Sequence, residues 1–153
     1  MHEALVRFVV DAEPRPQGSM TAVYNQRLGI ARVRHNAAPA LSLWRAQVRD
    51  AARAAGAIKW DGPIGLRASF GIRAPIDKRH GYPKSPDLDK LVRALMDALT
   101  DVCYRDDSQV VRIRTSKSWR AGTLVEVWRV ERKSSSAAQA SIWTPNAEGM
   151  GED

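Results

Sequence analysis

The chain has 153 residues, of which 44% are hydrophobic, and it carries a formal net charge of +7. This length fits one domain with one core and leaves no room for a second large domain. The positive charge favours a polyanionic partner, nucleic acid before membrane, because the sequence has no basic amphipathic helix of the membrane-binding type. Residues 1–133 carry +10, since the three charges after them, on Glu148, Glu152 and Asp153, are negative.

Cys103 is the only cysteine, which excludes an intrachain disulfide and a thiolate zinc site. We expect Cys103 to be buried, as most free cysteines are. The first apolar run is too short for a signal peptide, and no stretch is long enough to span a bilayer. The sequence therefore predicts a cytoplasmic protein with no membrane partner.

Runs rich in β-branched and aromatic residues predict strands over 6–10, 21–24, 30–34, 64–72 and 123–130. The second and third runs favour a hairpin from which Arg27, Arg32 and Arg34 project. Apolar residues at i, i+3, i+4 spacing predict a helix over 38–57, with Trp44 on its core face. After residue 131 the composition becomes low in complexity, and we expect residues 132–153 to form a disordered tail.

Two loops carry basic residues. Arg15 lies in a proline-bracketed loop after the first strand, where it either touches a phosphate or belongs to a solvated turn. Arg73, Lys78, Arg79 and Lys84 lie in or next to the loop that follows the 64–72 strand. They either neutralise the backbone of a phosphodiester substrate or form a solvated surface.

Residues 85–111 hold two acidic pairs joined by a short helix. Asp87 and Asp89 are two residues apart, and in an extended stretch this spacing points both side chains to the same side. Leu91, Leu95, Ala98 and Leu99 predict a helix that begins at Asp89 or Lys90 and stops near Thr100. Asp106 and Asp107 precede a predicted strand in which Val111 and Ile113 alternate with arginines and are half-buried.

The connection 101–105 is long enough to lead the chain back along the helix, so the two acidic pairs can meet. Converging carboxylates repel one another unless a cation lies between them, and Mg²⁺ or Mn²⁺ is the usual solution. The alternative is that Asp87 or Asp89 caps the helix while Asp106 and Asp107 form a polar turn. For Asp97 we prefer a structural ion pair with Arg93.

Other phosphate and metal motifs are missing. The segment from Asp87 is not a calcium loop, because Val92 stands where glycine is required. No Gly-rich loop ends in Gly-Lys-Ser/Thr, and no nucleophile elbow is present, which argues against nucleotide hydrolysis and serine hydrolase chemistry.

The segments PDLDKLVRALMDAL and DDSQVV resemble the RusA family of Holliday-junction resolvases, small endonucleases common in phages and prophages. An Asp-x-Asp leads into a helix with an Asp-Ala-Leu segment, and an Asp-Asp pair precedes a Gln-Val strand. The matching residues are Asp87, Asp89, Asp97, Ala98, Leu99, Asp106, Asp107, Gln109 and Val110. The resemblance implies an α+β fold, a small mixed β-sheet packed with two main helices in one domain over 1–131.

The resemblance also implies that Asp87, Asp89 and Asp107 bind Mg²⁺ or Mn²⁺, with Asp106 in a lesser role. The chain departs from the family at two positions. Lys90, which we count among the DNA-binding residues, stands where the family usually has asparagine, and Arg93 stands where it has a catalytic lysine. Arginine keeps the charge and binds phosphate but cannot donate a proton near neutral pH. Electrostatic stabilisation is therefore the role expected of Arg93.

These observations predict a Mg²⁺-dependent endodeoxyribonuclease that acts on branched DNA. It would resolve four-way junctions by paired symmetric nicks in DNA recombination and repair, and two nicks require a two-fold homodimer. One alternative is a DNA-junction binding protein without catalysis. Another is a nuclease that acts on other branched DNA or on RNA.

Overall fold

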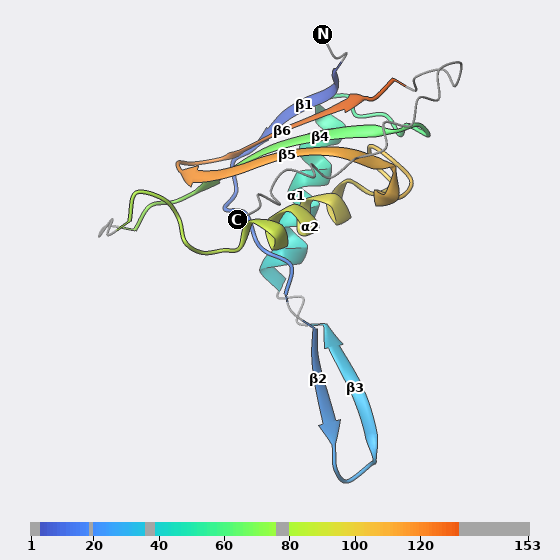
Figure 1. Cartoon of the computed structure of the whole chain (residues 1–153), viewed down its shortest axis with the longest axis vertical. Helices are drawn as coiled ribbons and strands as arrows, with labels where there is room; N and C mark the ends of the chain where they lie inside the picture. Colours follow the sequence, from blue (N-terminus) through green and yellow to red (C-terminus); the bar gives the residue numbers. More distant parts are fainter. Residues whose placement is uncertain (1–3, 19, 36–38, 76–79, 132–153) are drawn as a thin grey trace, which may run out of the picture.

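A four-stranded mixed sheet carries both helices on one of its faces in the computed structural model (Figure 1). The strands run in the order β1-β6-β4-β5, and only β4 and β5 are parallel. Their bounds are β1 Ala4–Val10, β4 Ile64–Ile72, β5 Val110–Trp119 and β6 Thr123–Arg129. The structure describes residues 4–18, 20–35, 39–75 and 80–131. The predicted α+β class, with a small mixed sheet and two main helices, is confirmed.

Each helix presents one apolar stripe to the sheet. Helix α1 (Pro39–Ala54) buries Leu41, Trp44, Val48 and Ala52. It ends three residues before the predicted limit, because Gly56 adopts a left-handed φ of +87°, which favours glycine and closes the helix. Helix α2 (Leu88–Leu99) buries Leu91, Ala94, Leu95, Ala98 and Leu99, and it begins one residue before the predicted start.

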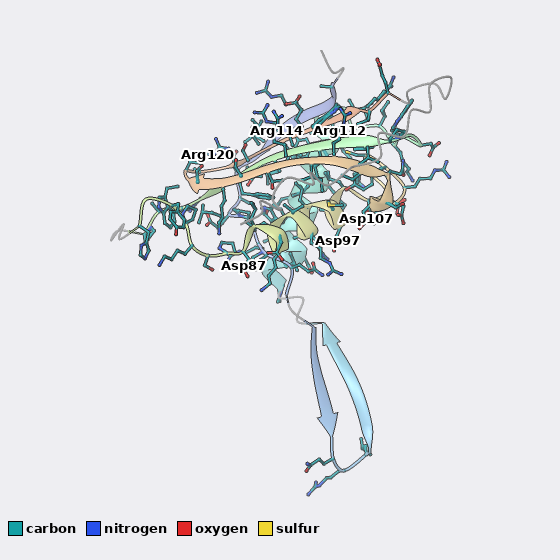
Figure 2. All side chains as sticks on the ribbon, in the orientation of Figure 1. Asp87, Asp97, Asp107, Arg112, Arg114 and Arg120 are labelled. Atoms are coloured by element: carbon teal, nitrogen blue, oxygen red, sulfur yellow. The ribbon has the colours of Figure 1, made fainter. Side chains whose placement is uncertain are left out.

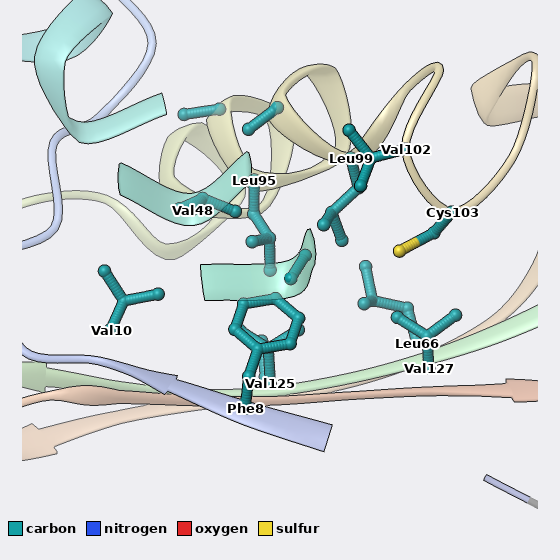
Figure 3. Close-up of a cluster of buried hydrophobic side chains, with 14 of the residues drawn as sticks. Phe8, Val10, Val48, Leu66, Leu95, Leu99, Val102, Cys103, Val125 and Val127 are labelled. Atoms are coloured by element: carbon teal, nitrogen blue, oxygen red, sulfur yellow. The ribbon is translucent and has the colours of Figure 1, made fainter. Parts of the chain in front are cut away.

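The core lies between the helices and the sheet (Figure 3). Phe8, Leu66, Val125 and Val127 point from the strands toward Leu95 and its neighbours on the helices. Cys103 belongs to this cluster, as predicted, and its burial raises the pKa of the thiol to about 12. A thiol that stays protonated and buried behaves as a small apolar side chain.

Strands β2 (Met20–Asn25) and β3 (Ile30–His35) form an antiparallel hairpin that projects from the body of the molecule (Figure 1). The predicted hairpin is therefore confirmed, and Arg27 in its turn is exposed. The predicted projection of Arg32 and Arg34 concerns side chains that lie outside the described part of the structure.

Strand β5 differs from its prediction. Val111 and Ile113 are 56% and 48% exposed, although the alternation with arginines predicts that they are half-buried. Strand β5 is an edge strand with a neighbour on one side only, and half-burial of this face begins at Thr115. The predicted tail over 132–153 lies outside the described residues. None of the helices in the described ranges is long and apolar enough to cross a membrane.

Candidate active site

The first acidic pair sits at the start of α2. Asp87 is the N-cap residue and Asp89 lies in the first turn. Asp87 has an extended backbone and Asp89 is helical, so the pair straddles the start of the helix. The predicted same-side arrangement of the two carboxylates stays a prediction. Asp87 Oδ2 lies 3.0 Å from Nζ of Lys90.

The second acidic pair surrounds a 3₁₀ turn, η1 (Asp107–Gln109). Asp106 is its N-cap, and the carboxylate accepts a hydrogen bond of 2.9 Å from the backbone N–H of Ser108. Hydrogen bonds from Ser108 lower the pKa of Asp106 below its usual 3.8. Asp106 therefore acts in local structure, as the turn alternative predicts, and Asp107 is left exposed beside it.

The connection between α2 and η1 is a turn rather than an extended segment. Tyr104 is fully buried, and its hydroxyl donates a hydrogen bond of 2.8 Å to the carbonyl of Met96. Asp101 takes a φ of +65° in this turn. Burial raises the pKa of Tyr104, and electrostatic interactions with Cys103, Asp107 and Asp97 raise it further. The buried phenol thus fixes how the chain leaves α2.

One cavity of about 590 Å³ is lined by a carboxylate from each of the two acidic pairs. Asp89 and Arg93 reach it from α2, and Asp107 reaches it from η1. Its remaining lining residues are Leu88, Val92, Met96 and Thr115. The cavity thus gathers one carboxylate of each predicted pair and the arginine that replaces the family lysine. Asp87 and Asp106 are not among the lining residues.

Asp97 has a structural role, but with a different partner from the predicted one. Its carboxylate lies 2.7 Å from Nη2 of Arg45 on α1, and the same guanidinium group donates a hydrogen bond to Gln17. The ion pair predicted between Asp97 and Arg93 is wrong, because Arg45 reaches Asp97 from the neighbouring helix. Among the described residues Arg93 has no ion pair, so its charge remains available in the cavity.

Lys117 on β5 holds the loop that enters the site. Its ammonium group donates hydrogen bonds of 2.9 Å to the carbonyl of Lys84 and 2.7 Å to that of Pro86. Both carbonyls lie directly before Asp87 and the start of α2. The edge strand therefore fixes the position of the loop from which the first acidic pair emerges.

The sequence of the chain is similar to that of a known protein family and of one bacterial protein. The profile of a family described as endodeoxyribonuclease RusA matches residues 15–128, which is well over half of the chain. The chain belongs to the RusA endodeoxyribonuclease family. It is also 38% identical over 61 residues to the uncharacterized protein YqaN of Bacillus subtilis (strain 168). That match covers 40% of this chain and 38% of YqaN, so the similarity spans less than half of either protein.

The basic residues predicted to bind DNA differ in their exposure and contacts. Arg15 and Lys84 are exposed, while Lys90 pairs with Asp87. Arg73 interacts with Glu13: its backbone N–H donates to the carboxylate over 3.2 Å, and Nε lies 3.8 Å from Oε2. Lys78 and Arg79 lie outside the described residues. The DNA-binding role of this set stays a prediction.

The donor set of the cavity lined by Asp89 and Asp107 fits a hard divalent cation. Mg²⁺ is commonly held by one or two carboxylates, with waters and substrate phosphates completing the shell. Asp89 and Asp107 supply two carboxylates to one cavity, and neither forms an ion pair within the described residues. No group of three or more His, Cys, Asp or Glu side chains among those residues is arranged to hold a metal. The site therefore fits an ion shared with substrate rather than one enclosed by protein.

Two features of the site could not be predicted from the sequence. The contact between Lys117 and the loop that it holds joins residues more than 30 positions apart, and no local pattern indicates it. Gln109 matches the RusA family pattern, but the sequence does not reveal which hydrogen bonds its side chain forms. Its Nε2 donates to the carbonyls of Trp60 and Gly62, and its Oε1 accepts from the backbone N–H of Arg105.

Proposed function

We propose that this protein is a divalent-metal-dependent endodeoxyribonuclease that nicks branched DNA at four-way junctions. The observation that carries the proposal is the cavity in which Asp89, Asp107 and Arg93 meet. Two carboxylates and a guanidinium group form a suitable set for phosphodiester hydrolysis, and the chain belongs to a family of endodeoxyribonucleases. The proposed cellular role is junction resolution in DNA recombination and repair.

Asp89 and Asp107 are the residues that would hold Mg²⁺, or Mn²⁺ in its place. Bound there, the ion would lower the pKa of a water molecule and polarise the scissile phosphate. Asp87 is not among the lining residues, and its carboxylate pairs with Lys90, so it would join the set by exchanging Lys90 for the ion. Asp106 supports the set indirectly, because it caps the turn that presents Asp107.

Arg93 binds and orients the phosphate. Its planar guanidinium group offers donors in a fixed fork that matches two phosphate oxygens, and no described carboxylate competes for them. Arginine is a donor of hydrogen bonds and not a general acid, so the role proposed for Arg93 is to stabilise developing charge without transferring a proton. The substrate enters a basic surround, to which Arg15, Arg73, Lys84 and Lys90 would contribute. Lys78 and Arg79 belong to the same prediction.

The proposed assembly is a two-fold homodimer. Resolution of a four-way junction requires two symmetric nicks, and each subunit of a dimer supplies one cavity. The two sites then face strands of the same polarity, which is the symmetry of the junction itself.

Nicking of a labelled four-way junction tests the proposal, with a linear duplex as the control substrate. Parent protein, Asp107→Asn and Asp50→Asn are compared with Mg²⁺ and with EDTA. Asp50 provides the matched control, because it is an exposed carboxylate on α1 that is not among the cavity-lining residues. Its ion pair is a 3.9 Å contact with Arg53. We expect Mg²⁺-dependent nicks at the junction, slower by about two orders of magnitude in Asp107→Asn and unchanged in Asp50→Asn.

Other outcomes distinguish the alternatives. Junction binding without nicks under any metal would leave a binding protein. Preferential cleavage of RNA or of duplex ends would assign a different substrate. Equal nicking in EDTA would remove the metal from the proposal.

A further inference from the structure

The face of the sheet opposite the helices is open and rich in arginine. Alternation along the strands places core residues such as Leu66 toward the helices and their neighbours toward this open face. Figure 2 shows Arg112 and Arg114 on the side of β5 away from Asp87, Asp97 and Asp107. The arginines of this face are Arg7, Arg67, Arg112, Arg114 and Arg120. Neither helix covers them (Figure 1).

Three of these arginines line a second cavity of about 460 Å³. Arg67 comes from β4, and Arg112 and Arg114 come from β5. Its other lining residues are Ile113, Glu126 and Trp128. Arg67 and Arg114 are direct partners across the parallel pair, and Arg67 is also the partner of Glu126 across the antiparallel pair.

The electrostatics of this second cavity are unbalanced. Like charges directly opposite each other on neighbouring strands destabilise a sheet. Three guanidinium groups face the single carboxylate of Glu126, which leaves two positive charges in excess. Over residues 4–18, 20–35, 39–75 and 80–131, no carboxylate forms an ion pair with Arg67, Arg112 or Arg114. An anionic partner would relieve this repulsion.

The shape of the face favours a phosphate backbone over exposed bases. Residues two apart on a strand are ~6.6 Å apart, and one DNA strand carries a phosphate every ~3.4 Å of helix axis, so Arg112 and Arg114 span about two phosphates. Single strands are bound on projecting aromatic rings. Trp128 lies against the backbone instead, since a Cβ on Gly65 would be 2.1 Å from its Cε2. The indole forms a wall of the cavity and does not project as a stacking platform.

We propose that this open sheet face binds the phosphate backbone of a duplex arm of the branched substrate. The inference rests on the proposed function and adds to it a second DNA surface, separate from the carboxylate cavity. A branched DNA has more than one arm, and the edge strand β5 lies between the two cavities, with Thr115 lining one and Arg114 the other. A second copy of the chain fits the face poorly, because two arginine-rich faces of chains that each carry +7 repel.

The test measures DNA binding in EDTA, where cleavage does not interfere. The variant is Arg112→Gln/Arg114→Gln, and the control is Arg49→Gln/Arg53→Gln on α1, which removes the same two charges. Labelled duplex and labelled four-way junction are titrated over a range of salt concentrations. We expect the β5 variant to bind about tenfold more weakly, with the slope of log K against log[salt] reduced by about 1.8, because each lost phosphate contact removes about 0.9. The control should bind like the parent.

Equal weakening by both variants would overturn the proposal and leave a dependence on net charge alone. Unchanged binding by the β5 variant would also overturn it. If the β5 variant lost more affinity for single-stranded nucleic acid than for duplex, the face would bind single strands and the proposal would be wrong. Circular dichroism shows whether the variants are folded.

The two proposals fail separately. If the parent nicks junctions and the β5 variant binds normally, only the second surface is wrong. If the parent nicks nothing but the β5 variant loses duplex binding, the surface stands and the nuclease proposal falls.

Discussion

At the scale of single residues, Arg93 separates this chain from the usual pattern of its family. It lines the cavity with Asp89 and Asp107, and no described carboxylate neutralises it. We expect Arg93→Gln to slow junction nicking by about 10²-fold, because it removes a positive group from the developing charge. Arg93→Lys should stay within about tenfold of the parent, since the charge is kept. Single-turnover rates between pH 6 and pH 9 measure both effects.

The pH profile decides between positioning and proton transfer. Arginine stays protonated over this range, so the parent profile should contain no limb that arises from this position. Matching profiles for parent and Arg93→Lys support a role in binding and orientation. A lysine variant that is much faster than the parent would contradict it and would point to a proton donor at this position.

The residues of the cavity could be predicted only in part. Asp89, Arg93 and Asp107 were singled out by spacing and resemblance, and the structure brings these three together. Asp87 illustrates the limit, because it matches the family motif but does not line the cavity. Its carboxylate pairs with Lys90, and the spacing of the motif does not reveal that contact.

At the scale of elements, Gln109 fixes the turn that carries Asp107. Its side chain forms four hydrogen bonds: two from the backbone N–H groups of Arg105 and Asp106, and two to the carbonyls of Trp60 and Gly62. Because each bond has a net contribution of about 0.5–1.5 kcal/mol, we expect Gln109→Ala to lower the free energy of unfolding by about 2–6 kcal/mol. Urea denaturation measures this loss, and nicking should also fall because η1 loses its anchor.

Gln47→Ala is the matched control, since Gln47 is an exposed glutamine on α1. We expect a change within about 0.5 kcal/mol, because surface substitutions away from special features have small effects. Equal destabilisation by both substitutions would show that the hydrogen bonds of Gln109 do not anchor the turn.

The bounds of an element can be predicted where the residues of that segment alone mark both of its ends. The strand over 64–72 was predicted with the bounds that the structure shows, because alternation and the flanking breakers mark both ends. The exposure of Val111 and Ile113 could not be predicted, since the same alternation suits a central strand and an edge strand. Only the strand order places β5 at the edge.

At the scale of the whole molecule, the two cavities lie on opposite faces of one sheet. The sequence mixes their residues along the same strand: Arg112 and Arg114 belong to one face, and Thr115 belongs to the other. The net charge therefore indicates that the chain is basic, but it does not reveal that the positive charge is divided between two surfaces. This division would let one subunit contact two arms of a branched DNA.

The symmetry of the proposed dimer yields a test of its own. If each subunit supplies one cavity, a heterodimer of parent and Asp107→Asn subunits has one active site and one inactive site. Differently tagged subunits, co-expressed and purified through both tags, should therefore nick one strand of a junction and leave it unresolved. Heterodimers of parent and Asp50→Asn subunits should make paired nicks at the parental rate. Paired nicks from the first heterodimer would contradict one site per subunit, and a chain that stays monomeric in light scattering with and without junction DNA would contradict the dimer.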